Sequence, residues 1–390
     1  MIYINAYSAI CALGSDNDKI ATALLNTQKE YLTKSSSFLK DEKSSYFGVI
    51  NADLKDLCEF DDHNSRNNRV LATLADRVKP VIEKLKQSYG SDRIGVVMGT
   101  STSGLEETVD SLKVYLEDGS KKDDFKYSYQ EFGSPSNFLS DYLSIKGPSY
   151  TISTACSSSA RALLSAKKLI ESGLCDAVIA GGADTLCSVP INGFDSMSVL
   201  SYDRCLPFNA DRHGINIGEA GGLMVLSLEK SSLVLKAVGQ SSDAYHPSAP
   251  DPTGEGAIRA MSLALKEANL QVSDIGYINM HGTATKLNDS MEALAVYSIF
   301  KDSVPCSSTK YLTGHTLGAA GILEACILCL LIDRKLPLPV QDFSKNKKDE
   351  ELSDIKFVKD TLHPLKMNMM SNSFAFGGNN TCVIIGENNE

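Results

Sequence analysis

The chain has 390 residues, of which 43% are hydrophobic and 22% are charged, and its formal net charge is −10. This composition is that of a folded globular protein and argues against disordered and fibrous chains. The acidic balance argues against nucleic-acid binding through overall charge, which requires a basic surface. No membrane span is expected, because the most apolar stretch, at residues 326–332, is much shorter than the ~20 residues that a spanning helix needs.

The N-terminus and the cysteines both indicate a cytoplasmic protein. The first residues, MIYINAYSAICALGSD, lack the charged n-region of a secretory signal peptide. Ten cysteines in 390 residues are too few for a disulfide scaffold, so we expect reduced thiols. Cys326 and Cys329 form one CxxC pair, but no second pair or nearby His completes a zinc site, and no metal is expected there.

Short β-branched runs alternate along the chain with longer helical patterns. Strands are predicted at residues 93–98, 149–153, 176–180, 223–228, 275–280 and 381–385. Helices are predicted at residues 157–172, 256–268 and 321–332. Charged runs at residues 120–124 and 345–351 predict solvated loops. The continuous apolar character of the strands is typical of strands covered on both faces, so we predict a layered α/β protein.

Two distant stretches share a pattern that suggests two related halves. Residues 153–170 and 313–331 each place a reactive side chain before a small-residue helix start and an apolar helix. The charged stretch 229–236 lies between them. We therefore divide the chain into an N-terminal half, residues 1–232, and a C-terminal half, residues 233–390, and expect the halves to pack closely.

Cys156 is the best single candidate for a nucleophile. It follows a predicted strand and stands immediately before a predicted helix, among small residues that leave room for a substrate carbonyl. A thiol at a helix N-terminus experiences the positive end of the macrodipole, which is expected to lower its pKa. The alternative is a buried structural cysteine, the usual fate of a free Cys.

Two of the six histidines stand at strand-to-helix turns, where layered α/β folds place their sites. His281 lies in NMHGTAT after a predicted strand, and His315 lies in a Gly-flanked turn before a predicted helix. Two imidazoles can polarise one carbonyl oxygen by donating hydrogen bonds to it. His63 and His363 lack such a context and are interpreted as surface residues.

Lys310 and Glu324 flank His315 in the sequence. A buried pair of these residues would order the imidazole, whereas the residue pattern by itself favours a surface ion pair. Further along, residues 374–380 read FAFGGNN, and Gly377 and Gly378 allow positive φ and a close backbone approach. Such a turn can direct an N–H at a developing oxyanion.

In chain order, these motifs resemble those of the β-ketoacyl-acyl carrier protein synthases of the elongating type, in the thiolase superfamily. The motifs are TACSSS (154–159), AGGAD (180–184), CLPFNADRHGINIGEAGG (205–222), SSDAYH (241–246), HGTAT (281–285), Lys310 with GHTLGAAG (314–321), and NSFAFGGNN (372–380). The resemblance covers nearly the whole chain. It implies one ketosynthase domain with the thiolase fold, a five-layered αβαβα arrangement built from two pseudo-symmetric halves.

The resemblance also implies a role for each site residue. Cys156 is the acyl-accepting nucleophile, His281 and His315 are the decarboxylation pair, and Lys310 and Glu324 support them. The N–H groups of Cys156 and Phe376 form the oxyanion hole, and Phe376 also gates the acyl pocket. Thr283 and Thr285 contact the phosphopantetheine arm. The substrate-binding residues of the acyl pocket are Phe194, Met197 and Phe374.

The implied reaction is a decarboxylative condensation of malonyl-acyl carrier protein with a Cys-bound acyl chain, and it requires no metal or redox cofactor. The implied partners are an acyl carrier protein and a second ketosynthase-like subunit, either identical or of the chain-length-factor type. The family often docks its carrier on a basic stretch, which here contains Arg66, Arg69, Arg77 and Lys79.

Several departures from the family pattern bear on the substrate. Lys286 stands where the family often has Pro, and Ser198 stands where a carrier-docking Arg is common. Ala375 replaces a common Gly beside the gate, which is expected to stiffen it. Together with the segments 101–105 and 288–293, these changes resemble the ketosynthases of aryl-polyene clusters more than the general fatty-acid elongating enzymes, which remain the alternative.

Three other readings are weighed against this one. A thiolase is expected to carry a second Cys where this chain has Phe376, and an initiating synthase is expected to carry Asn where it has His315. A non-catalytic chain-length subunit is expected to have lost the nucleophile, which Cys156 retains.

Overall fold

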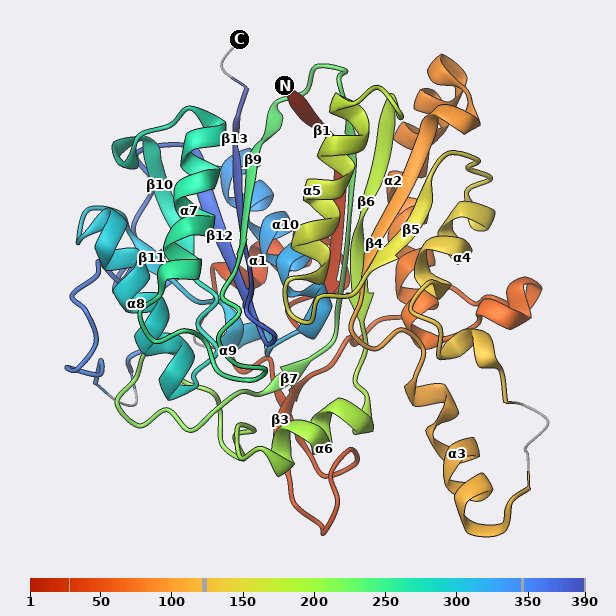
Figure 1. Ribbon diagram of the computed structural model, residues 1–390, viewed down its shortest axis with the longest axis horizontal. Helices are drawn as coiled ribbons and strands as arrows, with labels where there is room; N and C mark the ends of the chain where they lie inside the picture. The colour runs from red at the N-terminus through yellow and green to blue at the C-terminus, as the bar shows by residue number, and fades with distance from the viewer. Residues whose placement is uncertain (28, 121–124, 345–346, 389–390) are drawn as a thin grey trace.

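A ten-stranded mixed sheet forms the framework of the computed structural model, which describes residues 1–27, 29–120, 125–344 and 347–388 (Figure 1). The strands from one edge to the other are β11 (Cys306–Ser307), β10 (Ile275–Asn279), β12 (Asn368–Ala375), β13 (Asn379–Glu387), β9 (Leu233–Ser242), β1 (Ile2–Cys11), β8 (Ala220–Ser227), β6 (Ala177–Asp184), β4 (Ile94–Gly99) and β5 (Ser149–Ile152).

The sheet consists of two five-stranded halves with the same topology. In each half the spatial order of the strands is third, second, fourth, fifth and first, numbered along the chain. In both halves the first three strands of this spatial order are parallel to one another. The fourth strand pairs antiparallel with both the third and the fifth strand of that order. The halves meet where β1 pairs with β9 over residues 2–4 only. This repeat confirms the predicted pseudo-symmetric fold.

Helices cover the outer faces of both halves of the large sheet and also lie between the halves. The two central helices, α5 (Ser158–Glu171) and α10 (Ala320–Asp333), pack against each other. Helix α5 contacts β4 and β6 on one side and β9 and β13 on the other. The outer helices are α2 (Arg66–Tyr89) and α4 (Ser134–Tyr142) on the N-terminal half, and α7 (Glu255–Ala268) and α8 (Lys286–Phe300) on the C-terminal half. The layers are therefore αβαβα. Figure 1 shows α5 between β9 of one half and β6 of the other.

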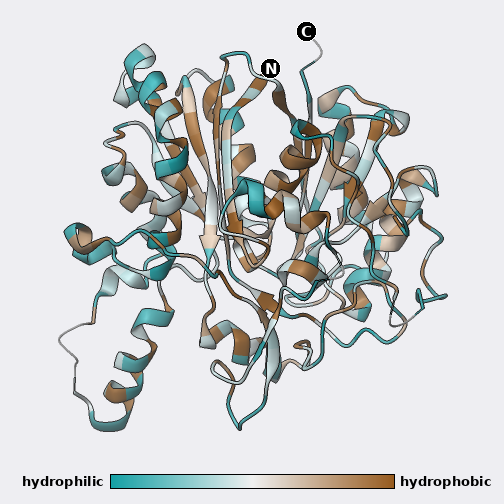
Figure 2. Cartoon of the chain, turned by 180° about the vertical axis from the view of Figure 1, so that it is seen from behind, coloured by the Kyte–Doolittle hydropathy of each residue, from teal (hydrophilic) through white to brown (hydrophobic). Residues whose placement is uncertain are grey.

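The hydropathy of the chain explains this layering. Strands β4, β6 and β8 are buried along their whole length, because helices cover both of their faces. Helix α10 is buried on every side from Ala320 to Ile332, as expected for a helix that is apolar all round. Figure 2 shows the apolar residues concentrated in the strands and central helices, and polar residues on the outer helices.

Smaller elements complete the fold. A three-stranded sheet has the order β2 (Thr33–Ser35), β3 (Ser45–Gly48) and β7 (Ile217–Gly218). The other α-helices are α1 (Asn17–Leu24), α3 (Glu106–Asp118), α6 (Ser188–Ser196) and α9 (Lys310–Thr313), and short 3₁₀ turns occupy Cys58–His63, Ser91–Arg93, Tyr127–Tyr129, Val272–Asp274 and Leu317–Ala319. Helix α3 projects away from the body of the molecule (Figure 1).

The predicted elements agree with this structure except at some boundaries. The strand predicted at 223–228 begins three residues earlier, at Ala220, because the small residues there let helix α10 approach closely. A Cβ at Gly222 would lie 2.9 Å from Ile322 of that helix. The charged stretch 229–236 is not a separate linker, since β9 already begins at Leu233. Residues 121–124 and 345–346 of the predicted loops lie outside the described residues.

Cys326 and Cys329 are core residues of α10 and are completely buried. Within the described residues, no helix is long and apolar enough to span a membrane.

Candidate active site

Cys156 lies at the start of the central helix α5, in a turn whose backbone is strained. The preceding residue, Ala155, has a φ of 50°, in the left-handed region that non-glycine residues seldom adopt. Ser157 donates to the carbonyl of Thr154, and Ser158 donates to the carbonyl of Ala155. These bonds hold the turn, and Cys156 is left with 7% of its surface exposed. Strain of this kind is typical of functional positions.

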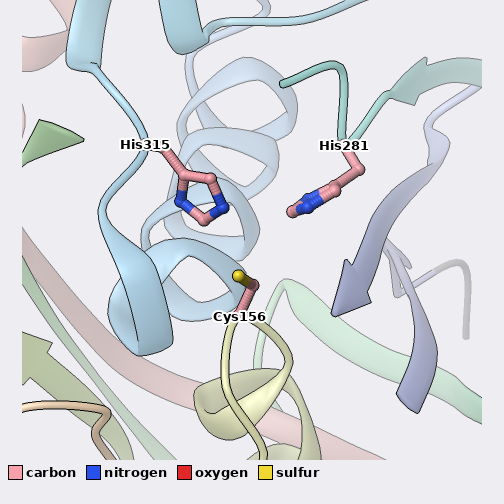
Figure 3. Close-up of side chains that lie close together, drawn as sticks. All are labelled: Cys156, His281 and His315. Atoms are coloured by element: carbon pink, nitrogen blue, oxygen red, sulfur yellow. The ribbon is translucent and has the colours of Figure 1, made fainter. Parts of the chain in front are cut away.

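The structure brings both predicted histidines to this thiol from the other half of the molecule. His281 follows β10, and His315 follows α9. Their ring centroids are 5.3 Å apart and the ring planes are nearly perpendicular. The sulfur of Cys156 and one nitrogen of each ring lie within 4.8 Å of one another. Figure 3 shows the sulfur facing the gap between the two rings.

Both imidazoles are neutral at physiological pH. Burial lowers the pKa of His281 and of His315 well below 6.5, and the charge of Lys310 acts in the same direction. In His315 the backbone N–H of Leu317 donates to Nδ1 over 3.0 Å, so the proton of the neutral ring is on Nε2. His315 therefore presents an N–H donor rather than an acceptor.

The sequence-based expectation of a lowered pKa at Cys156 is wrong. Burial raises the pKa of the Cys156 thiol to about 12, although Lys310 and the backbone N–H groups of Phe376 and Cys156 oppose this shift. The position of Cys156 before α5 stabilises the thiolate less than the loss of its hydration destabilises it. The free protein thus holds Cys156 as a neutral thiol, and the thiol must lose its proton during the reaction.

Lys310 and Glu324 form an ion pair inside the protein, with 2% and 3% of their side chains exposed. The alternative of a surface ion pair is therefore wrong. Ser371 also donates to Glu324, at 3.5 Å. Burial raises the pKa of Glu324 while the adjacent Lys310 lowers it. The pair places a cation, largely neutralised by its partner, behind the two imidazoles.

Two carboxylates of α8 that the sequence analysis did not single out hold the loop that carries His281. Glu292 accepts the backbone N–H groups of His281 and Gly282, both at 2.7 Å. Asp289 accepts the N–H of Ala284 at 3.2 Å. Their i, i+3 spacing directly after HGTAT was the available signal, because it places both on one face of the following helix.

Asp184 is a further buried carboxylate, and it joins separate segments near Cys156. It accepts bonds from the backbone and side chain of Thr102, from Thr100 and Ser101, and from the N–H of Ala319. These bonds tie the segment after β4 to the start of α10. The motif AGGAD contained this residue, but nothing in the sequence indicated which backbone groups it would bind.

A cavity of about 330 Å³ leads from the surface to Cys156 and the two histidines. Other predicted residues that line this cavity are Phe194, Thr283, Thr285, Phe374 and Phe376. Met197 does not line it and has 46% of its surface exposed, so this member of the predicted acyl pocket is wrong for the single chain. It is the C-cap of α6 and lies between Phe194 and Ser198, which both line the cavity, but its own side chain is turned outward.

Phe376 occupies the turn between β12 and β13, at the cavity wall. Its backbone N–H is near enough to the Cys156 sulfur to lower the pKa of that thiol, and its ring centroid lies 5.8 Å from that of Phe194. Gly377 and Gly378 follow with φ of 80° and 73°, which only glycine adopts readily. The turn can therefore bring a backbone donor to the sulfur.

The basic stretch predicted for carrier docking lies on α2 and does not line the cavity. Arg66 forms an ion pair with Glu219 at 2.7 Å. Arg69 donates to the carbonyl of Lys55, and Arg77 donates to Ser8. Arg66 in particular does not present a free charge, so carrier docking on this stretch stays a prediction.

Comparison with known families agrees with the site. The N-terminal domain model of β-ketoacyl synthases matches residues 82–231, and the C-terminal domain model matches residues 233–343. The chain belongs to the β-ketoacyl synthase family. Members of this family are condensing enzymes of the acyltransferase type, and the site described above lies in the matched residues apart from the β12–β13 segment.

Individual relatives cover three quarters of the chain or more. It is 30% identical to nodulation protein E of Rhizobium meliloti (strain 1021), over 98% of each chain. It is 34% identical to 3-oxoacyl-[acyl-carrier-protein] synthase 2 of the same strain, over 75% of this chain and 73% of the other. Among solved structures, the ketosynthase ApeO of Xenorhabdus doucetiae, in complex with its chain length factor ApeC, is 48% identical with a TM-score of 0.95, over 99% of this chain and 98% of the other.

Proposed function

We propose that this synthase catalyses the decarboxylative condensation of a malonyl thioester with an acyl chain carried on Cys156. The observation that carries the proposal is the buried thiol of Cys156, which faces two neutral imidazoles from the opposite half of the molecule. A non-catalytic chain-length subunit would not be expected to retain this thiol.

The first step transfers the acyl group to Cys156. The sulfur attacks the thioester carbonyl, a carbon–sulfur bond forms, and the bond to the departing thiol breaks. Because the pKa of the Cys156 thiol is raised to about 12 by burial, its proton leaves during the attack and ends on the departing sulfur. The N–H groups of Cys156 and Phe376 are the oxyanion donors in this proposal.

The second step uses the two imidazoles as hydrogen-bond donors. The malonyl thioester oxygen accepts the N–H groups of His281 and His315 as its carboxylate departs as CO₂ and negative charge develops on that oxygen. The resulting enolate carbon attacks the acyl-Cys156 carbonyl, the carbon–sulfur bond to Cys156 breaks, and a 3-oxoacyl chain two carbons longer leaves on its carrier. Cys156 departs as a thiolate and takes one proton from water, which restores the thiol. A neutral imidazole can serve this step because it retains one N–H, which donates to the oxygen.

The remaining residues position the reactants. We assign Lys310 and Glu324 to the ordering of the histidine pair, and Phe194 and Phe374 to the wall of the acyl pocket. Phe376 gates that pocket. Thr283 and Thr285 line the route that a phosphopantetheine arm would take to the thiol. The substrates are accordingly thioesters on the phosphopantetheine of an acyl carrier protein, and the catalytic unit is a single domain with halves 1–232 and 233–390.

We further propose that the acyl chain is an aryl-polyene-type unsaturated chain and that the enzyme works beside a chain-length-factor-like subunit. The 48% identity to ApeO, solved with its chain length factor, supports this choice. Fatty-acid elongation by a homodimer is the second candidate, and the 34% identity to a 3-oxoacyl-[acyl-carrier-protein] synthase 2 favours it. All ten cysteines have free thiols, which suits a reducing compartment such as the cytoplasm.

The decisive experiment compares polyenoyl and saturated carrier substrates of equal length, with and without the candidate partner subunit. Faster elongation of the polyenoyl chain, dependent on the partner, is the expected result. Equal elongation of both chains without a partner would replace this pathway with fatty-acid elongation. A chain that is never acylated on Cys156 by either substrate would overturn the condensation itself.

A further inference from the structure

The loop that follows β10 forms one wall of the active-site cavity and runs from the buried site to the surface. Exposure rises along it, from buried His281 and Thr283 through half-buried Thr285 to exposed Lys286 and to Leu287, which is 62% exposed. All five residues line the same cavity. Lys286 therefore stands at the outer end of the wall that leads to Cys156.

Lys286 differs from the other cation of this cavity in being available to a ligand. Arg212 is buried and paired with Asp349 and Asp289. Among the described residues, Lys286 has no carboxylate at ion-pair distance, although its charge contributes to the lowered pKa of Asp349, and its side chain is exposed. It is also the first residue of the 15-residue helix α8, whose dipole favours an anion at this end. A cation in this position attracts an anion to the cavity entrance, whereas the net charge of −10 of the whole chain repels anions.

We infer that Lys286 binds the phosphodiester of the substrate's pantetheine arm and thereby selects phosphorylated pantetheine thioesters. This inference rests on the proposed function, which places the thioester at Cys156 and the arm along Thr283 and Thr285. The one anionic group of such an arm is its phosphate, at the end far from the thioester. That end reaches the exposed part of the wall when the thioester lies at the thiol.

Ser198 also lines the cavity, just beyond α6, and is neutral at the position where the resemblance to elongating synthases leads one to expect a docking Arg. Among the described residues that line the cavity, Lys286 at the start of α8 is the exposed lysine. The contact is solvent-exposed, so we expect a contribution of about fivefold in substrate binding, equivalent to ~1 kcal/mol.

A pair of substrates that differ only in the phosphate tests the assignment. Acyl-phosphopantetheine and acyl-pantetheine are each offered to the whole protein, and the rate of Cys156 acylation is followed by intact mass at several concentrations. The wild type is expected to prefer the phosphorylated substrate through a lower KM. Lys286→Ala should reduce this preference about fivefold, and Lys286→Arg should restore most of it.

Lys301→Ala is the matched control, because Lys301 is an exposed cation at the other end of α8 and does not line the cavity. It should keep the wild-type preference. A preference that Lys286→Ala leaves intact, or that Lys301→Ala reduces equally, would overturn the assignment while Cys156 acylation, and with it the proposed function, stands. Failure of both substrates to acylate Cys156 would overturn both.

Discussion

The thiol and the imidazoles of the site can be separated by substitution, because we assign them to different chemical steps. Cys156→Ala is expected to abolish condensation but to retain malonyl decarboxylation, since both histidines remain. His281→Ala and His315→Ala should each accept an acyl group on Cys156 yet release CO₂ about 10²–10³-fold more slowly, the usual cost of losing one oxyanion donor. Intact mass and CO₂ release measure the two steps independently.

Each half of that prediction has its own contrary result. Normal condensation by Cys156→Ala would remove this residue from the mechanism. Normal CO₂ release by both histidine variants would remove the imidazole pair. His246→Ala is a suitable control, because His246 is exposed and does not line the cavity.

Glu292 makes stability depend on pH. Burial raises its pKa from 4.5 to about 7. Between these values the unfolded chain releases the proton that the folded chain keeps, so the free energy of unfolding falls as pH rises. Glu292→Gln cannot titrate, and its free energy of unfolding should fall less steeply between pH 5 and 7, by as much as ~1.4 kcal/mol per pH unit.

Urea unfolding of the two proteins at a series of pH values measures this difference. Asp289, whose pKa burial raises to about 6, remains in both proteins. Its charge raises the pKa of Glu292, so the difference between the two slopes measures Glu292 together with its coupling to Asp289. Identical slopes for the wild type and Glu292→Gln would show that Glu292 does not keep its proton on folding.

At the scale of elements, the crossing of α5 and α10 depends on a residue without a side chain. A Cβ at Gly321 would lie 2.7 Å from the Cβ of Ala160 and 2.8 Å from its backbone nitrogen. Because backbone cannot yield as a flexible side chain does, Gly321→Val should lower the free energy of unfolding by about 1–3 kcal/mol. It should also slow acylation, because α5 begins directly after Cys156.

Gly193→Ala provides the comparison for this substitution, since a Cβ at Gly193 meets nothing within 4 Å. Chemical unfolding and acylation rates of both variants are the measurements. A stability of Gly321→Val equal to that of the wild type would show that the two central helices can separate without cost.

The elements that the sequence predicted well are those with a continuous pattern of their own. The apolar runs of β4 and β6 and the small-residue start of α5 each contain enough local information. Glu292 and Asp289 were missed because they accept hydrogen bonds from backbone N–H groups of the preceding loop. Every residue except proline has such a group, so residue type does not show which of them a carboxylate will bind. The pKa of Cys156 was predicted wrongly because the prediction used only the helix that follows Cys156 in the sequence. The burial that raises this pKa comes from packing against the other half of the chain, which the local sequence does not show.

At the scale of the whole molecule, the site exists only because the two halves pack together. Cys156 comes from the N-terminal half, and His281, His315 and the Phe376 turn come from the C-terminal half. The sequence predicted two related halves from one repeated motif. The strand order within each half of the sheet could not be predicted from the residues. The contact that joins the halves, between β1 and β9, covers only three residues of β1 and has no recognisable sequence pattern.

The measurement that tests the account most directly is a single-turnover experiment on the acylated protein. The chain is first acylated by an acyl-carrier thioester, the adduct is located by mass, and malonyl-carrier protein is then added while CO₂ is counted. We predict one adduct on Cys156, discharged with one CO₂ and one 3-oxoacyl product two carbons longer. An adduct elsewhere, or discharge of Cys156 without CO₂, would contradict the account.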